Sequence, residues 1–403
     1  MSKQTQKGHF YAYILGILMC LPFINYGQLI LNQDETGTTQ NHSDSENVNL
    51  KDGYKYESTI DNYLHVFIDP SASGAEGYDG DARFSNQTFD RAIDQALTVG
   101  ITPGSYGVSP TGASTYSVPI ALPPGTASMM PSLAVAYSSQ AGNGLLGRGW
   151  NLAGLSAITR GNRNLYYDGE VHEIEFTNDD PFALNGNRLV LESGTYGGDE
   201  ATYKPEMEDF TLITSYGTVG DGPEWFKVET KSGVTFEYGR TADARLSKTI
   251  SSSSTTVFWM LSKIYDCYGN YVEYRYSETS RELRIEEILY TGNDDVTPVL
   301  EPYNKIKFYY EDREDQNETF VSGSTVRQNS ILTRIQITGE YDKIFKTYKF
   351  IYGYDLSGSY SGGINSYLNE IVEYGSDGEQ LNATRFQYGS GEQNQLQTYV
   401  QND

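Results

Sequence analysis

The chain has 403 residues, a formal net charge of −24, and 38% hydrophobic residues. That hydrophobic content is enough to form buried cores, which excludes a wholly disordered chain. Because 53 Asp and Glu face only 29 Lys and Arg, the surface repels a phosphate backbone, and the sequence predicts no nucleic-acid partner.

Residue usage favours β-structure throughout. The chain holds 34 Tyr and 41 Gly against 6 Met and 2 Cys, and tyrosine favours pleated sheets while glycine favours tight turns. Cys20 lies in the N-terminal apolar run, which leaves Cys267 alone, so no disulfide framework is expected. The composition predicts an all-β protein.

The N-terminus has the pattern of an export signal. Lys3 and Lys7 precede an apolar run over residues 10–24, and Gly27 is a small residue at the expected cleavage point. We therefore expect a signal peptide over residues 1–27, a secreted or extracellular protein, and no stable membrane span after cleavage. A membrane anchor is the alternative, but the run is shorter than the roughly 20 residues needed to span a bilayer. Lipidation at Cys20 is disfavoured because the bulky Met19 precedes it.

Two segments follow before the sequence changes character. Residues 28–53 are polar and poor in large apolar side chains, which predicts a linker. Residues 54–101 are mixed and of unclear role, with strand-like alternation at 63–68 and a short helical pattern at 89–97.

Residues 102–258 are expected to form a β domain whose first part is rich in Gly and Pro. Alternating runs predict strands at 116–122, 132–137, 171–176, 188–191, 226–230 and 235–238. The dipeptides Asp168-Gly169, Asn185-Gly186 and Asp221-Gly222 predict hairpin turns between strands.

Residues 259–403 contain a loose repeat of two strands joined by a turn. One unit pairs 261–266 with 271–276, and a later unit pairs 368–374 with 384–388. Between them, 283–290 is expected to pair with 305–310, and 332–337 with 348–352. Aromatic residues at alternate positions of the returning strands line one face, so stacked hairpins would bury an aromatic ladder.

Residues 107–160 hold the most distinctive pattern, a long ordered series of Gly, Pro, Leu and aromatic residues. The residues that define it are Pro110, Gly112, Tyr116, Pro119, Pro123, Gly125, Pro131, Leu133, Tyr137, Gly142, Gly144, Leu145, Leu146, Gly147, Gly149, Trp150, Leu152, Gly154, Leu155 and Ile158. This series closely resembles the opening motif of the SpvB-type N-terminal domain, which Tc toxin B components share. The unit at residues 263–276 resembles a YD repeat of the Rhs family.

The resemblance implies a multi-stranded Rhs-like shell and a secreted, non-enzymatic scaffold. Such a shell would enclose or assemble with a C-terminal toxin segment or with other Rhs or toxin-complex subunits. It also implies that the motif residues are structural, with no catalytic residue, cofactor or metal among them. On physical grounds, the glycines at 142, 144, 147 and 149 permit positive φ or close backbone approach. A phosphate-binding loop is disfavoured because no helix beginning with Lys-Ser or Lys-Thr follows.

Catalytic and metal-binding alternatives lack the required spacing. An ADP-ribosyltransferase needs a Ser-Thr-Ser/Thr strand before a Glu-x-Glu pair, but Ser254-Thr255-Thr256 follows Glu173-Ile174-Glu175. His42, His65 and His172 are scattered, Asp79-Gly80-Asp81 is expected to be a turn, and residues 312–315 a solvated loop.

Two other functions remain open. A cell-surface adhesin or carbohydrate-binding protein would display exposed tyrosines and Trp225 or Trp259 for stacking on sugars, whereas a shell would bury its aromatic residues. The other alternative is an ADP-ribosyltransferase-associated virulence protein that lacks its catalytic domain.

Overall fold

The computed structural model describes residues 100–250, 253–279, 282–321, 324–354, 365–388 and 398–401, residue 97, and four short strands before residue 69. The expected signal peptide, the turn at Asp79–Asp81 and nearly all of the helical pattern at 89–97 lie outside these residues. The chain divides into a small unit, residues 22–93 with 107–114, and a large unit that contains residues 115–403.

The small unit contains two parallel strand pairs. β1 (Glu35–Thr36) pairs with β3 (Tyr56–Glu57), and β2 (Gln40–Asp44) pairs with β4 (Leu64–Ile68). β4 agrees with the alternation at 63–68. β1 and β2 lie in the stretch expected to be an unstructured linker, since backbone hydrogen bonds across a parallel pair do not require apolar side chains on both strands.

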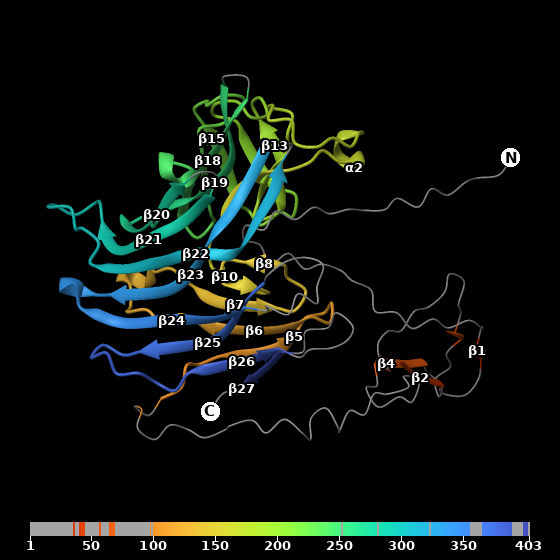
Figure 1. The fold of residues 1–403 in the computed structure, drawn as a ribbon. Helices are drawn as coiled ribbons and strands as arrows, with labels where there is room; N and C mark the ends of the chain where they lie inside the picture. Colours follow the sequence, from red (N-terminus) through yellow and green to blue (C-terminus); the bar gives the residue numbers. More distant parts are fainter. Residues whose placement is uncertain are drawn as a thin grey trace. The chain divides into compact units, whose positions relative to one another are not determined.

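The large unit confirms the all-β fold class, and a single sheet of 17 strands, β11–β27, organises it (Figure 1). Eight of these strands close into a barrel: β11 (Ala157–Arg160), β12 (Phe182–Leu184), β13 (Asn187–Ser193), β14 (Thr202–Pro205), β15 (Leu212–Tyr216), β16 (Trp225–Glu229), β17 (Thr235–Tyr238) and β19 (Ser253–Tyr265).

The barrel closes because β19 is long enough to serve two partners. Its middle, around Trp259, pairs with β11, and its last residues pair with β17. Inside, Phe226 packs edge-on against both Phe182 and Trp259, with ring centroids 5.4 and 5.1 Å apart. The buried aromatic rings fill the lumen of the barrel, as expected for eight strands.

From β19 the sheet continues through successive antiparallel strands. β18 (Arg245–Ile250) forms a hairpin with the start of β19. The others are β20 (Asn270–Thr279), β21 (Glu282–Asn293), β22 (Asn304–Val321), β23 (Ser324–Thr338), β24 (Ile344–Tyr354), β25 (Ser366–Tyr374), β26 (Thr384–Tyr388) and β27 (Thr398–Gln401). In Figure 1 the barrel strands gather at the top and β22–β27 form the layer beneath them.

A second sheet of four strands packs on this layer. Its order is β10 (Trp150–Ala153), β7 (Ala134–Ser138), β6 (Ser114–Pro119), β5 (Ser105–Val108). The rings of Tyr116 and Trp150 contact Phe386 of β26, with centroids 5.7 and 4.6 Å apart. Both sheets and the barrel share one continuous core.

The remaining elements are short. They are the hairpin strands β8 (Asn143–Gly144) and β9 (Gly147–Arg148), the single-turn helix α2 (Leu165–Asp168), and the 3-10 turns η1 (Thr126–Ser128), η2 (Ala242–Ala244) and η3 (Glu340–Asp342).

Most expected strands match observed ones, with three corrections. Residues 171–176 form only an isolated bridge at His172, not a strand, and Gly169 ends α2 with φ of 73° instead of turning a hairpin. Residues 312–315 lie inside β22 instead of in a solvated loop. By contrast, Asn185 and Gly186 form the expected two-residue hairpin turn, both with positive φ.

Candidate assembly site around the glycine-rich hairpin

The β8–β9 hairpin brings backbone unusually close to its neighbours. Gly147 has φ of +93°, and a Cβ placed there would lie 2.6 Å from the carbonyl oxygen of Ser366 in β25. At Gly144 a Cβ would lie 2.2 Å from the carbonyl oxygen of Trp150. Only glycine fits at these contacts. Gly142 differs from the expectation, because it has neither positive φ nor a close neighbour.

A buried ion pair in β22 holds this hairpin. Arg313 Nε donates to Asp315 Oδ1 at 3.0 Å, and both side chains are almost fully buried. The guanidinium also donates to the carbonyl oxygen of Gly144 and to Asn143 Oδ1, at 2.9 and 2.7 Å. Asp315 in turn accepts from the backbone N–H and the hydroxyl of Ser366. One salt bridge therefore joins β8, β22 and β25.

The electrostatics of Asp315 follow from these contacts. Burial alone would raise the pKa of its carboxyl, but hydrogen bonds from Arg313 and Ser366 favour the charged form and hold the pKa below its ordinary value. The Asp315 carboxylate therefore remains ionised at neutral pH.

Tyrosine hydroxyls fasten the rest of the motif to the large sheet. Trp150 Nε1 donates to the hydroxyl of Tyr388 in β26 at 2.9 Å, and the hydroxyl of Tyr348 accepts from the Ala121 backbone N–H at 3.1 Å. The hydroxyl of Tyr290 donates to the carbonyl oxygen of Pro123 at 2.9 Å. The motif is thus tied to strands β21, β24 and β26, far away in the sequence.

The other motif residues lie along the same four-stranded sheet and the entry to the barrel. Those buried are Tyr116, Pro131, Leu133, Tyr137, Gly144, Leu146, Gly147, Gly149, Trp150, Leu152 and Ile158. Those partly buried are Pro123, Gly125, Leu145 and Leu155, and those exposed are Pro110, Gly112, Pro119, Gly142 and Gly154.

A second buried ion pair braces the barrel. Arg160 of β11 lies 3.3 Å from Asp180 and donates to the carbonyl oxygens of Thr256, Thr177 and Asp221 at 2.7, 2.5 and 2.5 Å. Burial lowers the pKa of the Arg160 guanidinium, with Asp180 acting in the opposite direction. These bonds tie two loops, one containing Thr177 and Asp180 and the other Asp221, and strand β19 to β11.

Sequence reasoning missed both ion pairs. Exposed and buried residues alternate here: Asp312 and Glu314 are exposed, and Arg313 and Asp315 are buried. This alternation is the signal that could have indicated a strand with two charged side chains facing inward. No sequence pattern near Arg160 predicts Asp180 as its partner, because the two residues come together only in the folded chain.

The residues weighed for catalysis have other roles. Glu173 and Glu175 are exposed in an irregular segment, and Glu175 pairs with Arg163 at 2.5 Å. Ser254–Thr256 lie in β19, and Thr255 and Thr256 are buried. Among the described residues, no three His, Cys, Asp or Glu side chains gather as metal ligands. Within those residues, no helix has the length and hydropathy to cross a bilayer.

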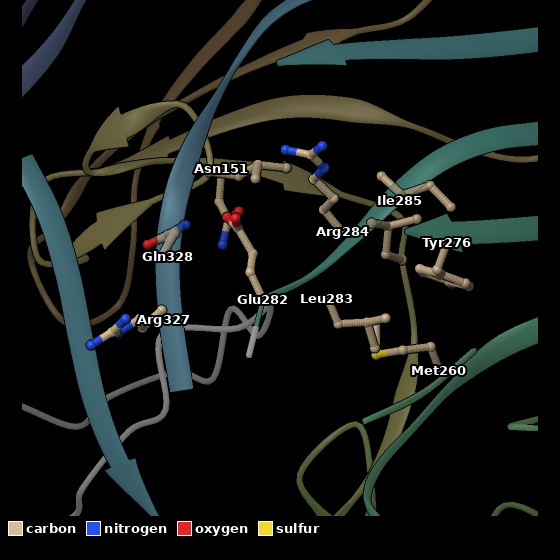
Figure 2. Close-up of a pocket in the computed structure, with 11 residues that line it drawn as sticks. Asn151, Met260, Tyr276, Glu282, Leu283, Arg284, Ile285, Arg327 and Gln328 are labelled. Atoms are coloured by element: carbon tan, nitrogen blue, oxygen red, sulfur yellow. The ribbon is translucent and has the colours of Figure 1, made fainter. Parts of the chain in front are cut away.

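A small cavity lies among β10, β19, β21 and β23 (Figure 2). Its volume is about 50 Å³, whereas small-molecule sites usually measure roughly 300–1,000 Å³. Glu282 on its wall accepts from the Ser330 backbone N–H at 3.0 Å and from the Ser330 hydroxyl at 2.9 Å. The carboxylate therefore serves to join β21 to β23.

Neither tryptophan weighed for sugar binding is freely displayed. Trp259 is completely buried in the barrel. Trp225 is partly buried, stacked on Tyr216 with centroids 4.5 Å apart and covered by Arg240 at 4.4 Å from its ring. Trp259 is therefore not available for stacking on a sugar, whereas tyrosines such as Tyr166 and Tyr268 are exposed.

Solved structures share this fold at low sequence identity. The crystal structure of TcdB2-TccC3 matches with a TM-score of 0.58 and 15% identity over 75% of this chain and 17% of that chain. The Photorhabdus luminescens Tc holotoxin pore matches with a TM-score of 0.56 and 16% identity over the same shares. The N-terminal domain of effector protein SpvB from Salmonella typhimurium strain LT2 matches with a TM-score of 0.51 and 16% identity over 64% of this chain and 98% of that domain. The chain thus spans about a sixth of the Tc chains.

The search of curated proteins gave no match. The family model described as Salmonella virulence plasmid 65kDa B protein matches residues 108–335, more than half of the chain and across the domain boundary expected at residue 258. It covers the glycine-rich hairpin, the barrel and both buried ion pairs. The chain therefore belongs to the SpvB family.

Proposed function

We propose that this chain is a secreted, non-enzymatic scaffold module that forms part of a β-shell around a toxin segment or against toxin-complex subunits. The observation that carries the proposal is the sheet itself, whose successive hairpins bury aromatic residues on one face. Along β20, for example, Val272, Tyr274 and Tyr276 are buried, whereas Glu273 and Arg275 face outward. A sheet built in this way lengthens by adding further hairpins.

The outward face of the sheet supports a structural role. Arg275 bridges Glu273 and Glu287 at 2.7 and 3.4 Å, and Arg385 pairs with Glu370 at 3.3 Å. The Arg275–Glu287 and Arg385–Glu370 pairs cross between neighbouring strands, and such pairs keep an extended sheet soluble and in register. The similarity of this fold to Tc toxin chains, over three quarters of this chain, supports a place in such a shell.

The proposal includes YD-type repeats in the second half of the chain. Tyr265 ends β19 and Asp266 follows it. Asp266 Oδ1 accepts from the backbone N–H groups of Tyr268 and Asn270 at 2.9 and 3.0 Å. Gly269 follows with φ of +78°. This Tyr-Asp turn before a returning aromatic strand supports the assignment as a repeat unit. The sequence pattern that predicts a signal peptide over residues 1–27 supports export.

The test is the composition of the native secreted product. An antibody against the large unit would isolate that product from culture medium, and mass spectrometry would identify its peptides and its intact mass. We expect peptides from further hairpin repeats or from a copurifying subunit, and we expect a cargo segment to resist protease until denaturant opens the shell.

The proposal is wrong if the secreted product ends near residue 403, copurifies with nothing and leaves no protected segment. That result would favour a free-standing surface protein. Retention of the product inside the cell would contradict the export signal alone.

A further inference from the structure

One end of the barrel displays a group of large apolar side chains, which we call the α2 patch: Leu165, Tyr166, Tyr167, Met207 and Phe210. Tyr166 is 86% exposed, Met207 76% and Phe210 71%. The first three belong to α2, which projects away from the barrel (Figure 1), and the other two lie in the loop between β14 and β15.

Specific contacts hold the two parts of the patch together. The hydroxyl of Tyr167 donates to the Glu206 carboxylate, which raises the pKa of Tyr167 to about 12. Arg188 of β13 pairs with Asp168 at the end of α2 at 2.5 Å, and its guanidinium lies 4.8 Å from the Tyr167 ring centroid. The patch is therefore a fixed surface.

The loop is anchored to the same strand. The Glu206 backbone N–H donates to the Arg188 carbonyl oxygen at 2.8 Å, and the Met207 backbone N–H donates to Asn187 Oδ1 at 3.3 Å. Phe210 has φ of +64°, a conformation that costs free energy for a bulky side chain. Fixed exposure of large apolar side chains is typical of a protein-binding surface.

The charges beside the patch indicate the kind of partner. Three acidic residues, Glu206, Glu208 and Asp209, lie within the loop. Lys231 lies 5.1 Å from the Phe210 ring centroid, and it has no carboxylate partner among the described ion pairs. Lys204 is paired with Glu192 at 2.5 Å. The rim is therefore acidic, so it repels anionic lipid and attracts Lys and Arg.

We propose that the α2 patch docks a polypeptide segment of a partner protein in which apolar or aromatic side chains are flanked by Lys or Arg. The apolar side chains would pack against Tyr166, Met207 and Phe210, and the basic residues would meet the carboxylates of the loop. This proposal does not depend on the shell role, because it concerns a surface outside the sheet that the shell would use.

Three synthetic fluorescent peptides would test it against the full chain. One has Phe and Leu flanked by Lys and Arg, the second has the same apolar core flanked by Asp and Glu, and the third has the basic flanks with Ser in the core. In fluorescence anisotropy titrations we expect only the first to bind, with affinity falling as salt increases. Equal binding of the second peptide, or no binding of the first, would overturn the proposal.

Matched substitutions locate the binding surface. Phe210→Ser should weaken binding of the first peptide roughly tenfold or more, as truncation of an interface anchor does. Tyr341→Ser is the control, because Tyr341 is also aromatic, exposed (82%) and at positive φ (60°), but lies in η3. If Phe210→Ser and Tyr341→Ser bind the first peptide with equal affinity, the α2 patch is not the binding site.

A second variant tests the charges without disturbing the loop. Glu208→Gln with Asp209→Asn keeps the side-chain oxygens that accept from the Phe210 and Thr211 backbone N–H groups at 2.7 and 3.1 Å. We expect weaker binding with a reduced salt dependence. In the unmodified chain, the bound peptide should protect the amides of residues 206–212 from hydrogen exchange, and protection confined elsewhere would refute the assignment.

Discussion

Arg313 and Asp315 stand two residues apart in β22 with their side chains on the same face and almost fully buried. Burying a charge is costly unless its partner and hydrogen bonds are all present. Here the partners are a side chain and a carbonyl of the β8–β9 hairpin and Ser366 of β25. The pair therefore specifies which segments meet at this point, more than it adds net stability.

We expect Asp315→Asn to lower the free energy of unfolding at neutral pH by about 3–5 kcal/mol, because it leaves Arg313 buried without its counter-charge. The pKa of Asp315 is lower in the folded protein than in the unfolded chain, where it is near 3.9. The ionised carboxylate therefore contributes to the free energy of unfolding above that pH, and this contribution is lost as pH falls through the folded-state pKa. The difference between variant and wild type should therefore shrink in acid, as measured by urea unfolding at a series of pH values.

Asp342→Asn is the control for this measurement. Its carboxylate pairs with Lys305 at 2.8 Å on the exposed surface, where ion pairs contribute little. We expect near wild-type stability at neutral pH. The opposite result is that the free energies of unfolding of Asp315→Asn and wild type differ by the same amount at every pH, including pH values below the folded-state pKa of Asp315. That result would show that lost packing, and not lost charge, explains the effect.

At the scale of elements, short-range patterns gave most strands. The strands at 235–238 and 384–388 were predicted to the residue, because regular alternation and nearby turn residues define them locally. Residues 171–176 alternate as well, yet they form no strand, since the barrel leaves no neighbouring edge for them to pair with beyond one bridge at His172. Closure of the barrel was not predictable, because it depends on β11 meeting β19 about 100 residues later.

The glycine-rich hairpin gives an element-scale prediction. Gly147→Ala should destabilise the protein by about 2 kcal/mol or more, because its Cβ would meet the Ser366 carbonyl oxygen in addition to the strain of positive φ. Gly233→Ala is matched, with φ of +79° and open space around the Cβ position, and should cost only about 1–2 kcal/mol. Thermal unfolding measures the stability that each variant loses relative to wild type. Equal losses of stability in Gly147→Ala and Gly233→Ala would mean that β9 can move away from β25.

Considered as a whole, the large unit has one core, and β19 belongs both to the barrel and to the extended sheet. The two parts cannot separate without breaking the pairing along this strand. The resemblance in residues 107–160 identified the family, but the residues that fix this arrangement, such as Tyr388 and Asp315, lie outside that motif and required the fold to be known.

We therefore expect the barrel and the sheet to unfold in one transition. Trp259→Phe removes bulk from the barrel core, and Tyr388→Phe removes the hydroxyl that binds Trp150 and the Leu368 carbonyl oxygen, each at a cost of about 1–3 kcal/mol. In chemical denaturation followed by circular dichroism and by tryptophan fluorescence, both substitutions should shift the same midpoint. Two transitions that respond separately would show that β19 does not couple the parts.

The closed barrel also gives the large sheet a direction. β11, its first strand, is paired on both sides, whereas the described part of β27, its last strand, is paired only with β26. Further hairpins of the proposed shell can therefore be added to the large sheet beside β27, whereas the β11 side offers them no unpaired strand.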